Sequence, residues 1–471
     1  MKLVASFQRK PLYFILLFSL IIRIAYLLID YPLWWDSHVY VGIGKYIFSG
    51  GEIGIWESFR PLVHPLILGI FWKAGFDPII IGKILDVAFS VLAIYFTYKI
   101  AEIVFNKKIA MLSSLLLSVT PIFLIHTGLI LTEPLALTLG LAGIYVLVRY
   151  QHLFSVFGAG VFIALSFLTR FPQGIWFAVM VGALVIPRGK ATLKLKTLAA
   201  LMLGFTLPIL PYLLFNYFRY GSPWDPLVAG SWIITTSTWL YDSGISYYFV
   251  HFFIFNAIYL FSFMYLYHYV RQREWFTMPK TIIVLIPIIT ILYYVYVPRK
   301  ELRYIVTSVP FLAMMVSWAV TTIYLKLKNR PRPFISARFF AVFCLILVII
   351  PIPGGVYFER PPAFETELTT VIENHNLTGL ILSSDPAFVS FLDHQVVTLD
   401  GMEFAPTIYQ QYKNKFELLF MNDCNLVCAP DDGVCQKQKE DLLRIMTSEN
   451  QAVFSESIDS CTYTIYLPVK S

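Results

Sequence analysis

The stretch PLYFILLFSLIIRIAYLLIDYPLWWDSH at residues 11–38 joins an apolar segment to a short polar end. Residues 11–29 are apolar enough to cross a bilayer, which takes roughly 20 residues of helix. Asp36 follows, next to Trp34 and Trp35, and tryptophan is enriched where membrane meets water. The stretch therefore predicts a membrane-spanning helix followed by a carboxylate at the membrane surface.

The whole chain shares this apolar character. Of its 471 residues 58% are hydrophobic and 14% are charged, and its mean hydropathy is +0.68. An ordinary soluble protein is much less apolar, so we expect an all-α polytopic membrane protein. Residues 358–471 differ, with 7 Lys/Arg against 17 Asp/Glu, whereas the first 357 residues have 29 against 12.

This division predicts two domains, a transmembrane domain at 1–357 and an extracytoplasmic domain at 358–471. The prolines of ERPP (359–362) suit a linker between them. We expect 11 membrane spans, at 11–29, 79–104, 109–126, 129–149, 153–169, 172–187, 197–218, 247–270, 278–297, 304–325 and 339–357. The apolar residues 62–76 are too short to span and predict an interfacial helix in the first outer loop, 30–78.

The distribution of basic residues predicts the orientation. With the N-terminus inside, 18 Lys/Arg fall in inner loops or ends and 8 in outer loops. An excess of positive charge on the cytoplasmic side is the rule for membrane proteins, so we expect the C-terminus outside. The protein would lie in the plasma membrane of a prokaryote or in the endoplasmic reticulum.

The C-terminal domain is expected to be a small α/β domain. Residues 377–385 and 394–401 predict short buried strands, and NKFELLF (414–420) and KQKEDLLRIM (437–446) have helical spacing. No catalytic motif is evident, which favours a packing or acceptor-docking role. Its four cysteines predict two disulfides in an oxidising compartment, because their spacing lacks the paired short knuckles of a usual zinc site; they are Cys424, Cys428, Cys435 and Cys461.

The predicted topology gathers the polar residues of the membrane domain at its outer face. They are Asp36, Glu57, Arg60 and His64 in the first loop, Glu133 in LTEPLAL, Arg170 in LTRFP, and Arg299, Lys300, Glu301 and Arg303 in RKELR. A partly desolvated carboxylate such as Asp36 can act as a general base, but it can also simply face water beneath an aromatic belt.

The other charged residues have similar alternatives. Glu133 precedes Pro134 at a helix N-terminus, where a carboxylate is also stabilised as a cap. Arginine matches phosphate oxygens in a fork, so Arg170 and the 299–303 cluster suit a lipid phosphate, or ordinary headgroup contact. His38 and His64 lack a second ligand at suitable spacing, so no metal is expected.

Four stretches resemble a known family. WWDSH after the first span, together with NYFRYGSPWDP (216–226), is similar to the GT-C superfamily of glycosyltransferases that use polyprenyl-phosphate sugars. IWESFRPLVHP (55–65) and RKELRYIVTSVP (299–310) resemble motifs of the dolichyl-phosphate-mannose-dependent α-mannosyltransferases of N-glycan and GPI synthesis. This chain has Ser37 where that branch has a second acid, and Arg299 in place of a histidine.

The resemblance implies transfer of a hexose, with mannose favoured, to a hydroxyl of a glycan, lipid or protein at the outer face, by inversion. Asp36 would be the base, and Arg303, Lys300 and Arg170 would stabilise the departing phosphate. The remaining substrate-binding candidates are Glu133, Arg299, Glu301, Tyr304, Glu57, Arg60, His64 and Trp56. No cofactor and no nucleic acid would be needed.

Two other functions are compatible with a polytopic chain. A transporter or flippase would carry polar groups within the membrane, such as Lys83 and Asp86 on one helical face, although these two residues can also pair with each other. An oligosaccharide transferase acting on asparagine would need a divalent metal held by several acids, of which only Asp36 and Glu133 are well placed.

Overall fold

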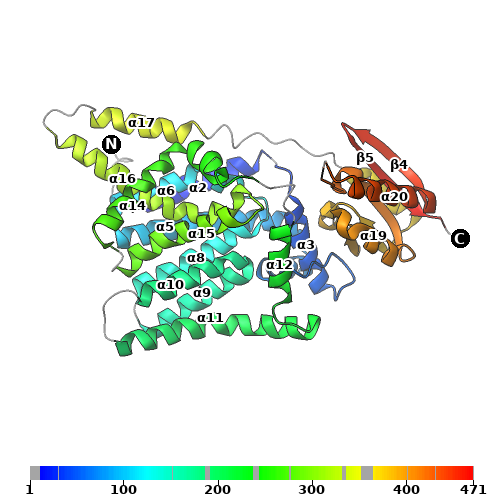
Figure 1. Cartoon of the computed structure of the whole chain (residues 1–471), viewed down its shortest axis with the longest axis horizontal. Coiled ribbons are helices and arrows are strands. Elements are labelled where there is room, and N and C mark those ends of the chain that lie inside the picture. The colour runs from blue at the N-terminus through cyan, green and yellow to red at the C-terminus, as the bar shows by residue number, and fades with distance from the viewer. Residues whose placement is uncertain are drawn as a thin grey trace. The chain divides into compact units, whose positions relative to one another are not determined.

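The protein is mostly helical, with a small sheet near its C-terminus (Figure 1). The computed structural model describes residues 11–29, 31–150, 152–185, 191–236, 243–274, 277–330, 336–351, 364–399, 401–429 and 431–469. The predicted linker at 359–362 lies outside these ranges.

Five helical stretches among the described residues are long and apolar enough to cross a membrane. They are α5 (Pro78–Val104), α8 (Thr132–Arg149), residues 195–220 of α11 (Ala191–Tyr220), α15 (Met278–Tyr296), and residues 302–328, formed by η5 (Leu302–Ser308) and α16 (Val309–Lys328). The chain is therefore a multi-pass membrane protein. Shorter apolar helices are α2 (Pro11–Leu27), α4 (Val63–Lys73), α9 (Leu153–Thr169), η1 (Phe171–Gln173) with α10 (Gly174–Val185), and α17 (Ala337–Ile349). The count of 11 spans and the orientation remain predictions.

Two predicted spans are not continuous helices. Residues 109–126 fall into α6 (Lys107–Val119) and α7 (Pro121–Ile125), because Thr120 is extended and Pro121 has no N–H for a continuing helical hydrogen bond. Residues 247–270 consist of the π-helix η2 (Phe249–Ile254), the 3₁₀ helix η3 (Ala257–Phe261) and α14 (Ser262–Arg271). Unbroken single helices were therefore a wrong prediction for both segments.

Small residues bring α9 and α11 together. A Cβ at Gly160 of α9 would lie 2.4 Å from the carbonyl oxygen of Leu201, and a Cβ at Gly204 of α11 would lie 2.1 Å from that of Phe157. Neither position has room for a larger residue. Glycine at such crossings lets membrane helices approach closely, which is a main source of their packing energy.

The C-terminal part contains a five-stranded sheet in the order β2-β1-β3-β5-β4. The strands are β1 (Leu380–Ser383), β2 (Val396–Thr398), β3 (Phe416–Asn422), β4 (Asn450–Ile458) and β5 (Cys461–Pro468). β1 pairs in parallel with β2 and β3, whereas β5 pairs antiparallel with β3 and β4. The helices of this part are α18 (Glu365–His375), α19 (Gly401–Tyr412) and α20 (Gly433–Glu449), with the 3₁₀ helix η7 (Pro386–Ser390) after β1.

The strands expected within 377–385 and 394–401 and the helix expected at 437–446 are confirmed. The helix expected at 414–420 was wrong, because this segment forms the central strand β3. Phe416, Leu418, Leu419 and Phe420 are all buried there. A continuous apolar run fits a strand covered on both faces, and periodicity alone cannot distinguish it from a buried helix.

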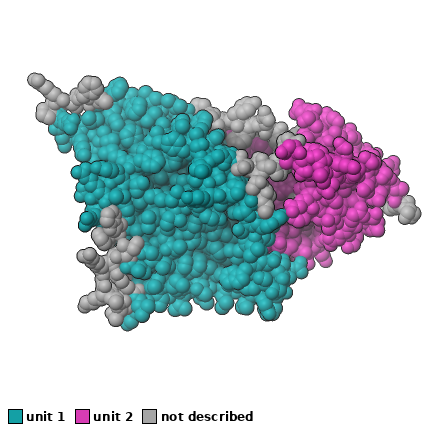
Figure 2. Space-filling model, in the orientation of Figure 1, with its two compact units in different colours: residues 1–30, 59–63, 83–357 teal, residues 31–58, 64–82, 358–471 magenta. Residues whose placement is uncertain are grey.

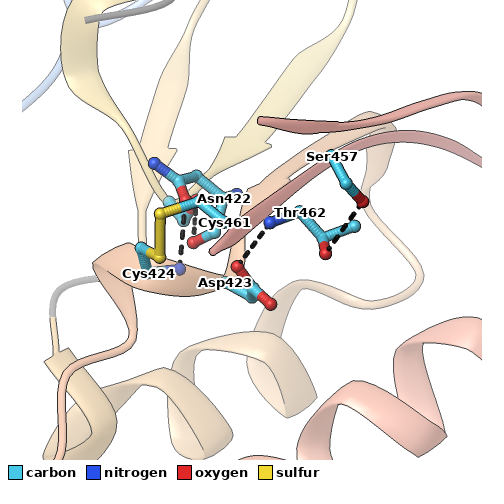
Figure 3. The surroundings of a disulfide bond; sticks show 7 residues. Asn422, Asp423, Cys424, Ser457, Cys461 and Thr462 are labelled. Carbon is cyan, nitrogen blue, oxygen red and sulfur yellow. Dashed lines mark hydrogen bonds between the residues drawn. A yellow bond between two sulfur atoms is a disulfide. The ribbon is translucent and has the colours of Figure 1, made fainter. Parts of the chain in front are cut away.

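Two disulfides join the four cysteines of this part, as predicted. Cys424 pairs with Cys461 next to a hydrogen bond from the Thr462 N–H to Asp423 (Figure 3), and Cys428 pairs with Cys435. Cys344 is a free, buried thiol.

The chain forms two compact units (Figure 2). Unit 1 contains residues 1–30, 59–63 and 83–357, and unit 2 contains 31–58, 64–82 and 358–471. The division differs from the predicted domains in one respect, because most of the first loop belongs with the C-terminal part rather than with the membrane helices.

Candidate active site

Asp36 lies in the first turn of α3 (Trp35–Phe48), in unit 2, and is half-buried. The positive end of the helix dipole there favours a carboxylate. The buried Ser37 accepts a hydrogen bond at its Oγ from the backbone N–H of Trp34, 3.2 Å away. Ser37 therefore takes part in capping the start of α3, at the position where the resembling branch carries a second acid.

The other candidates of the first loop in unit 2 are mostly buried. The Glu57 and His64 side chains are within the interior, and the His64 ring meets the Tyr40 ring of α3 edge-on at 5.5 Å between centroids. Trp56 is half-buried and its ring centre lies 5.4 Å from that of Tyr46. These ring contacts pack His64 and Trp56 against α3. Arg60 belongs to unit 1, with its guanidinium 4.8 Å from the Phe59 ring centre.

Glu133 and Arg170 form an ion pair in unit 1. Arg170 donates from Nη1 to Glu133 Oε1 at 2.5 Å, and the same nitrogen lies 3.5 Å from the Thr132 hydroxyl. Glu133 is 1% exposed and sits in the first turn of α8, while Arg170 follows the last residue of α9. The pair confirms that sequence motifs 37 residues apart meet, and it gives Glu133 a role beyond helix capping.

Glu301 gathers the charges of the RKELRY stretch. Its carboxylate lies 2.6 Å from Arg299 Nε and 2.6 Å from Arg303 Nε, and it accepts a 2.8 Å hydrogen bond from the Tyr304 hydroxyl. Burial would raise the pKa of Glu301, but the positive charges of Arg303 and Arg299 outweigh burial and hold that pKa below its usual value. Glu301 therefore stays ionised and fixes the direction of both arginines.

Tyr304 connects these two groups of charges. The guanidinium carbons of Arg170 and Arg303 each lie 5.7 Å from the centre of its ring, within cation–π range. The ring also stacks on Tyr294 at 4.7 Å. Lys300 adds a further buried cation, which donates to the Val297 carbonyl.

This unit 1 cluster, which we call the arginine cluster, consists of Glu133, Arg170, Arg299, Lys300, Glu301, Arg303 and Tyr304. It has four cationic and two anionic side chains, so it keeps a net positive charge. Its carboxylates hold the guanidinium planes in fixed orientations. An anionic group such as a phosphate monoester or diester matches that charge and donor geometry.

Two polar residues of unit 1 near the arginine cluster were not among the predicted site residues. The buried His126, which follows α7, interacts electrostatically with Glu133, Arg303 and Arg170. Asp86 was considered with Lys83, either as a polar group of a transport path or as its ion-pair partner; its Oδ2 accepts the N–H groups of Gly128 at 3.2 Å and Ile130 at 2.7 Å.

Asp86 holds an unusual turn next to Glu133. Gly128 and Ile130 both have positive φ, at 94° and 56°, which is uncommon for a β-branched residue such as isoleucine. This loop leads directly into α8 and therefore sets the position of Glu133 in the first turn of that helix. The only sequence signal for His126 and Asp86 was a polar residue in an apolar segment.

Within the described ranges, His, Cys, Asp and Glu side chains form no group of three or more that could hold a metal ion. The structure thus offers donors for an anion in the arginine cluster and a carboxylate at the start of α3, each within its own unit.

A family model described as dolichyl-phosphate-mannose-protein mannosyltransferase matches residues 60–215. The matched segment carries Arg60, His64, Glu133 and Arg170. A search of curated protein sequences finds no significant match.

Three solved structures share the fold over nearly the whole of this chain. ArnT from Cupriavidus metallidurans, bound to undecaprenyl phosphate, is 13% identical with a TM-score of 0.66, covering 98% of each chain. The oligosaccharyltransferase AglB from Archaeoglobus fulgidus, in complex with an inhibitory peptide and a dolichol-phosphate, is 12% identical with a TM-score of 0.60, over 97% of this chain and 74% of that one. The arabinofuranosyltransferase AftD from Mycobacteria is 11% identical with a TM-score of 0.60, over 98% of this chain and 40% of that one.

The chain is a multi-pass membrane protein with a small C-terminal α/β part. Its fold is similar to those of the solved structures of ArnT, AglB and AftD.

Proposed function

We propose that this protein transfers a sugar from a polyprenyl-phosphate carrier to an acceptor hydroxyl at the outer or lumenal membrane face. The observation that carries the proposal is the arginine cluster in a chain of this fold, because it presents oriented cations to a phosphate. Two of the similar structures are complexes with undecaprenyl phosphate and with a dolichol-phosphate, which supports the same donor class here.

The proposed reaction is a single inverting displacement at the anomeric carbon. The acceptor oxygen forms a bond to that carbon as the bond from the carbon to the phosphate oxygen breaks. Asp36 takes the acceptor proton, and the electron pair of the broken bond leaves with the polyprenyl phosphate. Arg303, Arg170 and Lys300 stabilise the charge that grows on the phosphate, while Glu133 and Glu301 keep the arginines oriented.

Mannose is the favoured donor sugar because both the RKELRY motif and the matching family model point to mannosyl chemistry. Glu57, Arg60, His64, Trp56 and Tyr304 are proposed to bind or enclose the sugar or acceptor. A transporter is less well supported, because Asp86, an intramembrane charge that suggested one, bonds to a backbone turn.

Asp36→Asn tests the base directly. We expect the purified variant to lose turnover by about 10²–10⁴-fold if Asp36 removes the proton. The matched control is Glu52→Gln, an exposed acid of the same loop, which should keep the wild-type rate. Wild-type turnover by Asp36→Asn would remove Asp36 from the mechanism.

The donor is tested by offering mannosyl, glucosyl, galactosyl and arabinofuranosyl polyprenyl phosphates, each on undecaprenyl and dolichyl carriers. We expect transfer from the mannosyl donor and an inverted linkage in the product. Transfer from another sugar alone would correct the donor and leave the class of reaction in place.

A further inference from the structure

The helix that carries Asp36 packs on the C-terminal part of the chain, within unit 2. α3 contacts η7, although about 340 residues separate them in sequence. The approach is very close at Gly42, where a Cβ would lie 2.3 Å from Val389 Cγ1 and 2.3 Å from Ile55 Cγ2. Only glycine fits there, so α3 and η7 form one packed layer.

Lys45 anchors the far end of α3. Its side chain is 3% exposed, and its ammonium lies 2.9 Å from Asp393 Oδ1, 3.2 Å from the Leu392 carbonyl and 3.5 Å from the Ser390 carbonyl. A lysine has three donors, and here all the acceptors come from one turn of the C-terminal part. A buried ammonium is costly without such partners, so Lys45 holds α3 to this turn.

Two further contacts hold the same surfaces together. His38, two residues from Asp36, bonds through Nδ1 to the Ser390 hydroxyl at 2.6 Å. Downstream of α3, the Gly54 N–H donates to the His394 carbonyl at 2.8 Å, and the Val396 N–H donates to the Gly54 carbonyl at 2.8 Å. The first loop thus extends the sheet at its β2 edge.

We infer that the C-terminal part positions the proposed base, and that Lys45 is a positioning residue acting on Asp36 through α3. The inference rests on the proposed function of Asp36. The two positions are nine residues apart on one helix, a rise of about 13.5 Å, and the helix between them moves as a rigid rod. A displacement at the Lys45 end is therefore passed to Asp36, and misplacement by about 1 Å can cost about 10²-fold in rate.

Asp393→Lys is the main test, because the Asp393 side chain is 59% exposed and its reversal leaves the sheet intact while placing an ammonium opposite Lys45. We expect kcat to fall by about 10–100-fold at saturating acceptor, with the donor KM within twofold, since the phosphate-binding residues lie in unit 1. The matched control is Glu440→Lys, an exposed acid of α20 in the same part, which should keep the wild-type kcat.

Lys45→Met keeps the apolar stem of the side chain and removes its charge, and it should show the same fall in kcat. A double-mutant comparison identifies the route: in the Asp36→Asn background, Asp393→Lys should have no further effect on the residual rate. An equal fall in both backgrounds, or wild-type kcat in Asp393→Lys and Lys45→Met, would overturn the inference.

The outcomes separate the two proposals. If Asp36→Asn is inactive while Asp393→Lys and Lys45→Met turn over normally, the base stands and the positioning role fails. If Asp36→Asn is itself fully active, the proposed function of Asp36 fails, and the positioning inference fails with it.

Discussion

The polar contacts of the candidate site residues join positions at very different distances in the sequence in the two units. In unit 1, Glu301 pairs with arginines two residues away on either side, and Glu133 reaches Arg170 across 37 positions. In unit 2, Lys45 pairs with Asp393 across 348 positions and His38 bonds to Ser390 across 352. The proposed phosphate site thus joins two groups of short-range pairs, at 133–170 and 299–304, whereas the surroundings of the proposed base depend on both ends of the chain.

The largest effect is expected from a substitution of Arg170 in unit 1. Arg170→Met leaves Glu133 buried without its ion pair, which should destabilise unit 1 by about 3–5 kcal/mol and abolish most activity. Thermal unfolding of the purified protein in detergent measures the loss. The double variant Arg170→Met/Glu133→Gln should recover much of the stability but not the activity. Equal stability of the single and double variants would show that the pair is not what holds α8 and α9.

A smaller effect is expected at Asp86, which does not belong to the arginine cluster but bonds to the turn that precedes α8. Asp86→Leu removes the acceptor of two buried N–H groups and should cost about 1–3 kcal/mol. Asp86→Asn keeps a side-chain oxygen at this position and serves as the matched control, with a melting temperature near that of the wild type. If asparagine proves as damaging as leucine, then the carboxylate charge and not the two hydrogen bonds is what the turn requires.

The smallest expected effect is a dependence of the stability of unit 2 on pH, through His38. Burial lowers the pKa of His38 to about 4, against the raising effect of a hydrogen bond to the Leu33 backbone. An unfolded histidine titrates near 6.5, so between pH 6.5 and 4 the unfolded chain binds more protons than the folded one. The stability of unit 2 should therefore fall as the pH drops through this window.

Melting curves between pH 7.5 and 4.5 measure this loss. His38→Gln should flatten the dependence, while His375→Gln, at an exposed position of α18, should leave it unchanged. A wild-type slope in the His38→Gln protein would assign the acid sensitivity to another group.

The local motifs were predictable because each lies at a helix end. LTEPLAL and LTRFP mark the start of α8 and the end of α9, and RKELRY precedes α16, so their charges could be assigned to one region from the sequence. No such sequence signal shows that residues 247–270 do not form one continuous helix. A π-helix and a 3₁₀ helix have the same apolar composition as a regular span, and only tertiary packing selects them.

The contacts of unit 2 could not be predicted for a different reason. Nothing in WWDSHVYVGIGK specifies Ser390 or Asp393 as partners, because a buried lysine and a small residue such as Gly42 are compatible with many packing surfaces. The strand β3 was mistaken for a helix since its burial on both faces removes the alternation that marks a strand. Prediction from the sequence was most successful for charged motifs at helix ends, and least successful for packing between segments that are far apart in the sequence.

The pairing of Gly54 with β2 also bears on how the chain is made. The partners of this first-loop segment are His394 and Val396, so it must wait for about 340 further residues to be synthesised. At ribosomal rates of about 5–20 residues per second, that delay is roughly 17–70 s. During this time the α3 segment, with its tryptophans, has no partner surface from the end of the chain. The order of synthesis therefore makes the first loop one of the last parts of this protein to complete its contacts.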